Sequence, residues 1–346
     1  MTSCPTCATI KRMTVTFALT PSAASAAPGR MRPLNILRDL PTVADLIELC
    51  FANTLDPDGR NYIDQMRRNG GDSGFLDWAP RVIESVSLPL SGFVWEDDGR
   101  IVGNVSLIPF SKGGFKVFLI ANVATHPDYR RRGIARALTQ AAIQRAREKR
   151  ADTIWLHVRQ DNPGAIALYQ ELGFYERARR TTWYTSSTNI PPLLNGRANT
   201  ISIRPRSSWD WPQQSRWLEI SYPSSLDWYF AHRWSILKPG LVNGIYRFLA
   251  DIDTLHWAAY KDNRLGAVLS CQRTNGRSDH LWLATPRRPD PEIVTALLLH
   301  GRRILSERYS LSLEFPAGVA DEAIREAGFQ PQRTLIWMET HGTQPR

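Results

Sequence analysis

The stretch FLIANVATHPDYRRRGIARAL, residues 118–138, decides the fold of this chain. Its first eight residues are mostly apolar, as in a strand that lies buried within a sheet. The strand ends at His126 and Pro127, and a basic, glycine-containing turn leads into a helix that runs to about Arg150. We therefore expect a strand, a loop and a helix in direct succession.

The loop between this strand and this helix has the chemistry of a phosphate-binding site. A helix N-terminus presents backbone N–H groups without intrahelical partners and carries a partial positive charge. Gly133 lets a ligand approach the backbone closely, and Ala135 is the next smallest choice. Four arginines add charge-assisted donors that suit a pyrophosphate: Arg130, Arg131, Arg132 and Arg136.

The basic loop lacks the motifs of two common nucleotide-binding folds. The sequence contains neither the GxxxxGK[ST] pattern of nucleotide-hydrolysing loops nor a GxGxxG turn that would open a dinucleotide-binding sheet. A solvated basic face or a nucleic-acid footprint would account for the arginines. Neither accounts for the embedded Gly-x-Ala, and the aromatic residues of an RNA-reading sheet are absent there. Nucleic acid is therefore an unfavoured partner.

Working outward, the pattern predicts an α/β fold. Before the loop we expect a strand at 32–37, then a helix whose apolar face carries Val43, Leu46, Ile47 and Cys50 and whose first turn holds Pro41. Strands at 91–95, 101–108 and 116–125 form an antiparallel meander, and 55–80 has no assignment. After the loop we expect a strand at 153–158, a helix at 164–172 and a strand pair that closes the unit near Tyr184.

Three blocks of this region resemble the GNAT superfamily of acyl-CoA-dependent N-acyltransferases. The loop matches its [Q/R]-x-x-G-x-[G/A] signature through Arg130, Gly133 and Ala135. The segments NVATHP, at 122–127, and NPGA with LYQELGF, at 162–165 and 168–174, match the flanking elements in the right order. The resemblance covers about 31–187. It implies a sheet that splays open beside the loop, with acetyl-CoA as co-substrate and no metal.

The resemblance also implies roles for individual residues. The backbone of Val123, Ala124 and Thr125 would bind pantetheine, and Asn162 would contact the same arm. The pyrophosphate cradle would comprise Arg130, Arg131, Arg132, Gly133, Ile134, Ala135, Arg136 and Ala137. Tyr169 would protonate the departing thiolate. Two structural alternatives stay open: Tyr169 as a core aromatic, and Asn162 as the cap of the second helix.

A general base is missing where many relatives carry a carboxylate. The corresponding positions are Ala121 and Asn122, and neither can accept a proton from an ammonium group. Remote candidates that could act through water are Glu84, Asp97 and His157. Otherwise the acceptor amine must arrive neutral, or activity is low.

The second half is similar to the first, in a weaker form. Segments 264–270, 281–286 and 326–329 parallel 100–106, the end of the strand before the loop, and 171–174. The loop position holds Arg-Arg-Pro-Asp-Pro at 287–291, which offers no glycine, and Ile324 replaces Tyr169. We expect a degenerate GNAT-like domain. Eight of the twelve tryptophans lie in this half. They would either pack the core and the interface between the halves or form an apolar wall for the acceptor substrate.

Composition bounds the remaining possibilities. The 346 residues carry a net charge of +10, with 42% hydrophobic residues and no long apolar run, so we expect no membrane span and a cytoplasmic protein. Cys4 and Cys7 form a CxxC without the second pair that zinc requires, so we expect no metal. The expected division is 1–30 as an extension, disordered or non-native, 31–187 as the catalytic domain, 188–200 as a linker and 201–346 as the second domain.

The resulting hypothesis is an N-acetyltransferase that moves an acetyl group from acetyl-CoA to a primary amine within a ternary complex. A small molecule or a peptide would be the acceptor. The alternative is a non-catalytic acyl-CoA-binding sensor, which the missing carboxylate favours. The sequence names neither the acceptor nor the oligomeric state.

Overall fold

The computed structural model describes residues 29–52, 55, 57–69, 91–186, 201–229, 234–240, 243, 245, 253–273, 278–305 and 310–342. Glu84, Cys4, Cys7 and the expected linker lie outside these ranges, so the predictions placed on them stay predictions. None of the described helices combines the length and the apolar character that crossing a membrane requires.

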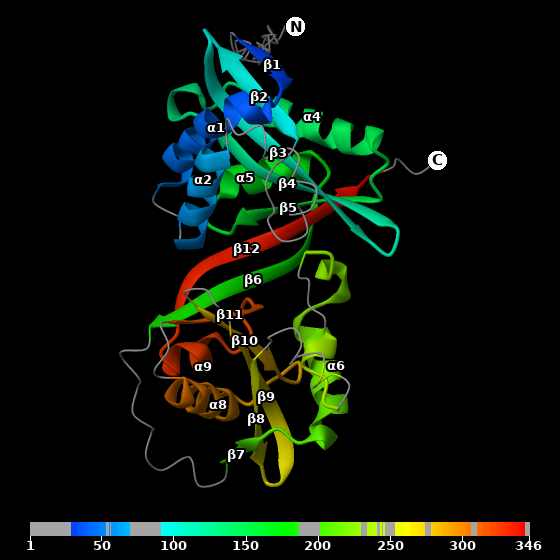
Figure 1. Cartoon of the computed structure of the whole chain (residues 1–346), viewed down its shortest axis with the longest axis vertical. Coiled ribbons are helices and arrows are strands. Elements are labelled where there is room, and N and C mark those ends of the chain that lie inside the picture. Colours follow the sequence, from blue (N-terminus) through cyan, green and yellow to red (C-terminus); the bar gives the residue numbers. More distant parts are fainter. Residues whose placement is uncertain are drawn as a thin grey trace, which may run out of the picture.

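The described strands form one continuous sheet of twelve strands (Figure 1). Their order is β1-β2-β3-β4-β5-β12-β6-β11-β10-β9-β8-β7. The bounds in the first half are β1 Arg30–Pro33, β2 Gly92–Asp97, β3 Arg100–Lys112, β4 Phe115–Thr125, β5 Thr153–Arg159 and β6 Tyr175–Ser186. Those in the second half are β7 Ile201–Pro205, β8 Thr254–Lys261, β9 Arg264–Gln272, β10 Asp279–Ala284, β11 Ser310–Pro316 and β12 Gln330–His341.

The order of the strands is the same when it is read from either edge. β1 to β5 of the first half correspond to β7 to β11 of the second half, and β12 and β6 lie side by side at the centre (Figure 1). Each half gives its last strand to the other half, because β12 pairs with β5 and β6 pairs with β11. The expected strand pair near Tyr184 is therefore not local: β6 is one strand, and its partners both come from the second half.

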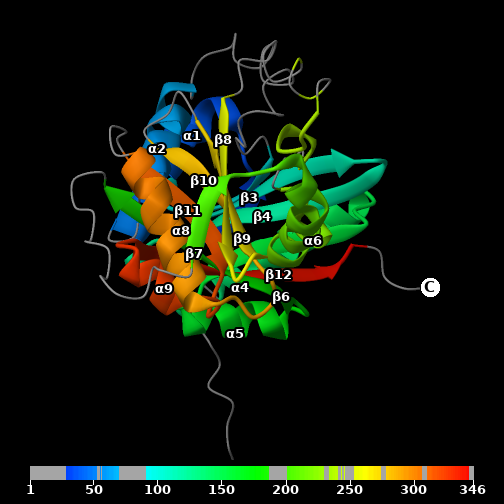
Figure 2. The same ribbon diagram turned by 90° about the horizontal axis from the view of Figure 1, so that it is seen from below.

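Helices cover both faces of the sheet. The first half contains α1 Ile36–Phe51, α2 Pro57–Asn69, α4 Ile134–Glu148 and α5 Pro163–Glu171. The second contains α6 Trp211–Ser221, α8 Pro291–Ile304 and α9 Asp321–Glu326, with α6 and α8 on opposite faces (Figure 2). Short 3-10 turns lie at Pro127–Tyr129, Ser208–Asp210, Ser224–Leu226 and Trp234–Ile236.

The apolar face of α4 fixes the helix against the sheet. Ile134, Leu138 and Ala142 are buried against Val105 and Ile120. A Cβ atom on Gly103 of β3 would lie 2.7 Å from Cγ2 of Ile134, so this close packing requires glycine. In the second half a Cβ on Gly266 would lie 2.3 Å from Ile293 of α8, so the close packing of α8 on β9 requires glycine in the same way.

The meander, α4, β5 and α5 confirm the sequence-based expectations, whereas the beginning of the chain differs. The first strand ends at Pro33, and α1 begins at Ile36 because the Asn35 side chain accepts a hydrogen bond from the backbone N–H of Arg38. Pro41 consequently lies inside α1, one turn later than expected. Val43, Leu46 and Ile47 form the buried face of α1 as predicted.

Candidate active site

The sheet opens beside the loop that follows β4. β4 and β5 are parallel neighbours only where Val117 to Ile120 face Thr153 to Leu156. Beyond Ile120, β4 stays paired with β3, while β5 stays paired with β12. The two strands therefore separate, which leaves the backbone of 121–125 unpaired on the β5 side. The splayed sheet that the family resemblance implies is present.

A β-bulge marks the point of separation. The register between β3 and β4 shifts between Asn104 and Ser106, and Asn122 takes the unusual φ of 53°. The Asn104 side chain stabilises this conformation, because its Nδ2 donates to the backbone oxygen of Asn122 at 2.9 Å. Asn122 in turn donates to the Tyr62 hydroxyl at 2.9 Å and to Ser106 Oγ at 3.3 Å. Polar groups from α2, β3 and β4 thus meet at the bulge.

The N-terminus of α4 has no side-chain cap. Gly133 is the N-cap residue with φ 81°, and no side chain in the described part of the chain caps the first-turn N–H groups. Arg131 also has a positive φ, of 65°, so the loop turns these N–H groups outward. A Cβ on Gly133 would meet no atom within 4 Å, which shows open space in front of the backbone. An anion is the natural partner of such a helix end.

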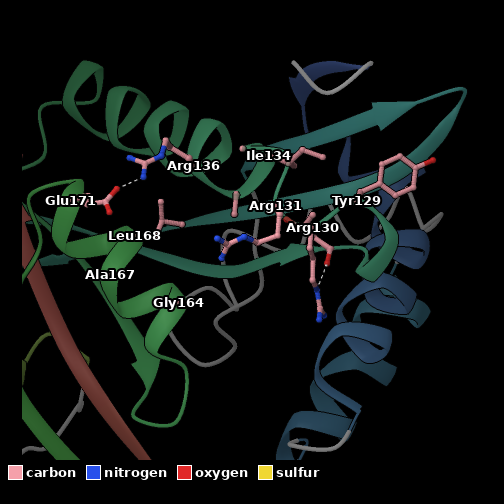
Figure 3. A pocket seen from close by; sticks show the side chains of 12 residues that line it. Tyr129, Arg130, Arg131, Ile134, Arg136, Gly164, Ala167, Leu168 and Glu171 are labelled. Atoms are coloured by element: carbon pink, nitrogen blue, oxygen red, sulfur yellow. Dashed lines mark hydrogen bonds and ion pairs between the residues drawn. The ribbon is translucent and has the colours of Figure 1, made fainter. Parts of the chain in front are cut away.

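A pocket of about 410 Å³ lies between this loop and α5 (Figure 3). Seven predicted cofactor residues line it: Thr125, Arg130, Arg131, Gly133, Ile134, Ala135 and Arg136. The Arg131 side chain extends toward α5 in Figure 3. Thr125 Oγ1 is buried without a hydrogen-bond partner among the described residues, so its hydrogen-bonding capacity is unused there. These residues fit the pyrophosphate and pantetheine arm of acetyl-CoA.

The other five predicted cofactor residues do not line this pocket. The N–H of Ala137 already donates to the carbonyl of Gly133, 3.0 Å away. Arg132 turns back onto the ring of Tyr129, at 4.8 Å, and the oxygen of Asp128. Val123 and Ala124 pack into the cores on the two faces of the sheet. Asn162 caps α5 by accepting from the N–H of Ala165 at 3.1 Å, so the capping alternative is confirmed.

Sequence reasoning missed the α5 wall of the pocket. Gly164, Ala167, Leu168 and Glu171 line it. They are spaced i, i+3, i+4 and i+7, so one face of the helix points at the loop. The sequence predicts this shared face once the bounds of the helix are known. Glu171 also forms an ion pair with Arg136 across the pocket, which joins α5 to α4 (Figure 3).

Tyr169 lies in the core beneath the pocket. It is 7% exposed, and its ring meets Phe174 edge-on with centroids 6.2 Å apart. Burial raises the pKa of its hydroxyl to about 12. The side chain is not part of the pocket wall, so its expected role as an acid stays a prediction.

Of the remote base candidates, His157 offers little basicity at neutral pH. Burial, helped by the positive charge of Arg333, lowers the pKa of His157 to about 4. Burial raises the pKa of Tyr62, at the bulge, to about 12. Asp97 is buried at the end of β2, beside the hairpin that leads to Arg100. Neither His157 nor Tyr62, at the open part of the sheet, titrates near pH 7.

Comparison with known proteins places this geometry in a family. Residues 59–174 match the model of the "Acetyltransferase (GNAT) family". The ribosomal protein bS18-alanine N-acetyltransferase of Escherichia coli K12 is 40% identical over 80 residues, 23% of this chain and 49% of that protein. N-alpha-acetyltransferase 30 of Schizosaccharomyces pombe is 32% identical over 102 residues, 29% of this chain and 68% of that protein.

Solved structures extend the likeness to the second half, as fold alone. A GCN5-related N-acetyltransferase from Sphaerobacter thermophilus aligns over 92% of this chain and 97% of its own, with a TM-score of 0.55 and 15% identity. The chain spans about half the length of the first curated relatives it matches. The 32% identity with N-alpha-acetyltransferase 30, over 68% of that protein, shows together with the splayed sheet and the uncapped α4 that this chain belongs to the GNAT acetyltransferase family.

Proposed function

We propose that the first half of this protein transfers an acetyl group from acetyl-CoA to an amine. The observation that carries the proposal is the uncapped N-terminus of α4, which faces an arginine-lined pocket where β4 and β5 separate. Arg131 and Arg136 would bind the pyrophosphate with the first N–H groups of α4. When bound, acetyl-CoA supplies the activated thioester that an amine attacks directly.

The chain's own groups would hold and orient the reacting atoms. Unpaired backbone N–H groups near Val123 and Ala124, on the β5 side of β4, would stabilise negative charge on the carbonyl oxygen. Asn122 and Tyr62 would bind the acceptor at the bulge through polar but uncharged groups. Tyr169 would donate toward the leaving sulfur.

The acceptor would be an amine that is partly neutral at physiological pH. His157 is too weak a base to remove a proton from an ammonium group near pH 7, and the Tyr62 hydroxyl keeps its own proton at that pH. At pH 8 about half of an α-amino group is neutral, against roughly 0.4% of a lysine side chain. The names of the relatives, which include alanine and N-alpha acetyltransferases, support the same choice of a peptide α-amine.

A glycine pair tests the location of the cofactor site. In Gly133→Ala we expect acetyl-CoA affinity, measured by calorimetric titration, to fall at least about tenfold, because the new methyl group occupies the space in front of the backbone. The matched control is Gly113→Ala in the β3–β4 turn. Gly113 also has a positive φ, of 58°, and open space around it, so it shares the backbone strain without the ligand.

Two results would contradict this assignment. Equal affinities in wild type, Gly133→Ala and Gly113→Ala would place the cofactor elsewhere. Failure of the wild type to bind acetyl-CoA would remove the acetyltransferase and the sensor alternative together. The sensor alternative, which the uncharged bulge at Asn122 favours, predicts tight binding without thiol release across a panel of peptides with free N-termini.

A further inference from the structure

A short segment of the second half lies on the sheet of the first half. The segment 224–229 follows α6, and its Leu226 is completely buried together with Val117, Leu119, Trp155 and Trp337. Trp228 packs on Phe110 of β3, with ring centroids 5.0 Å apart, and on Trp155 of β5 at 5.6 Å. These contacts fix the segment on the face of the sheet opposite α4.

Tyr229, the next residue, is placed differently from its anchoring neighbours. Its ring lies 4.7 Å from that of Trp337 and 6.4 Å from that of His157. Its side chain nevertheless keeps 37% of its surface exposed, whereas Trp337 is 2% exposed. Tyr229 is therefore held by the core but is not enclosed by it.

The face that Tyr229 covers leads to the bulge. Alternate residues of a strand point to the same face, so Val117, Leu119 and Ala121 of β4 share a row. His157 continues the row that Trp155 begins on β5, beside the opening between the strands. His157 directly follows Leu156, the last β5 residue that pairs with β4, and its ring lies 6.4 Å from that of Tyr229. Tyr229 thus stands beside the open space between the strands, where Asn122 of the bulge binds the Tyr62 hydroxyl.

The described groups that bear on this space are mostly uncharged. Tyr62 and Tyr229 bring hydroxyl groups, and His157 is uncharged at neutral pH. The charge of Arg333 reaches both His157 and Tyr229, while the Glu314 carboxylate is bound by Arg180 at 2.6 Å. Such walls suit the amides of a peptide whose α-amine is neutral, and they disfavour a second cation.

We propose that Tyr229 of the second half forms a wall of the acceptor site in the first half, where it positions the N-terminal residues of a peptide. The inference rests on the proposed function, because it takes the bulge of β4 as the reacting centre. It assigns the second half a part in acceptor selection, through a residue that touches the peptide and not the cofactor. The pocket that receives acetyl-CoA lies on the other side of the opening, against α5.

A conjugate of both ligands tests this without knowledge of the natural acceptor. The probe is CoA joined through an acetyl linker to the α-amine of a tetrapeptide that begins with alanine. We expect wild type to bind the conjugate at least about tenfold more tightly than CoA alone. Tyr229→Phe should lose part of that gain, about three- to tenfold, and Tyr229→Ala nearly all of it. CoA affinity should stay within about twofold in both, which also shows that they are folded.

The control is Tyr175→Phe, at a tyrosine of β6 with similar exposure, 40%, whose hydroxyl donates to Glu339 away from the bulge. It should keep the full gain. The proposal is overturned if Tyr229→Ala keeps the gain, or if the conjugate binds wild type no better than CoA does. In either case, retained CoA binding would mean that the proposed cofactor site still stands and that only the role of Tyr229 is wrong. Loss of CoA binding in wild type would instead end the proposed function, and this inference with it.

Discussion

Tyr169 combines deep burial with a hydroxyl that keeps its proton at every physiological pH. Burial raises its pKa to about 12, so it can donate a hydrogen bond to a thiolate, although complete proton transfer is uphill by several pKa units. We therefore expect Tyr169→Phe to lower kcat about ten- to a hundredfold, at the low end of general acid catalysis. Acetyl-CoA affinity should stay within about twofold.

The measurement is steady-state thiol release at saturating acetyl-CoA, with Tyr175→Phe as the matched loss of a phenol elsewhere. Unchanged turnover in Tyr169→Phe would reduce Tyr169 to an aromatic of the core, packed on Phe174. A fall in thermal stability without a fall in kcat would lead to the same conclusion.

At the scale of the elements, one ion pair joins α4 to α5 across the pocket. Arg136 and Glu171 both line the pocket, and they bind each other. An incoming phosphate must compete with Glu171 for Arg136 and must also tolerate a carboxylate nearby. We expect Glu171→Gln to tighten acetyl-CoA binding about three- to tenfold in low salt. The effect should fade near about 0.5 M salt, because both side chains are about half exposed.

Glu148→Gln is the control for this prediction. Glu148 ends α4 and pairs with Arg145 at 3.4 Å, far along the helix from the pocket. The Glu148→Gln variant removes the same charge without affecting Arg136, so its affinity for acetyl-CoA should match that of wild type. Equal tightening in the two variants would show a general effect of net charge, and weaker binding in Glu171→Gln would show that the ion pair holds the pocket in shape.

The sequence predicts best those elements whose signals are local. The run from Phe118 to Leu138 shows a buried strand, a glycine turn and a helical period, and the structure follows it closely. α2 was missed because it buries little: Ile63 and Met66 are its buried apolar residues, too few to set a clear period. The wall formed by α5 required the helix to be placed before its spacing had meaning.

The exchange of β6 and β12 had no local signal at all. Both strands show ordinary strand character. Their pairing joins residues about 160 positions apart, such as Trp337 with Ala178, and β12 also pairs with β5 across 180 positions, at Trp337 and His157. Sequence similarity between the halves indicates two copies but says nothing about which copy receives which strand. The same limit applies to the acceptor side, where Tyr229 meets first-half residues only through the fold.

At the scale of the whole molecule, the two halves open their sheets alike but fill the openings differently. β10 and β11 pair only where 279–281 face 311–313, as β4 and β5 do. In the second half the Tyr222 side chain, 2% exposed, lies against the backbone amide of Leu283, two residues beyond the last β10 residue that pairs with β11. Arg180 is buried beside it, bound to Glu314 and to the oxygen of Ser221 at 2.7 Å. We therefore expect the second half to leave no room for a cofactor arm.

The N-terminus of α8, which corresponds to α4, carries a side-chain cap and two carboxylates. Asp290 caps α8 by accepting from the N–H of Glu292 at 2.9 Å, and Glu292 adds a second carboxylate to the first turn. Lys261 binds both carboxylates, at 2.8 and 3.1 Å, which leaves its charge already neutralised. We therefore expect calorimetric titration to give one acetyl-CoA per chain, with Gly133→Ala weakening that single site. Two sites would mean that a phosphate displaces Asp290 from α8, and a stoichiometry of one that survives Gly133→Ala unchanged would mean that the occupied half is the second.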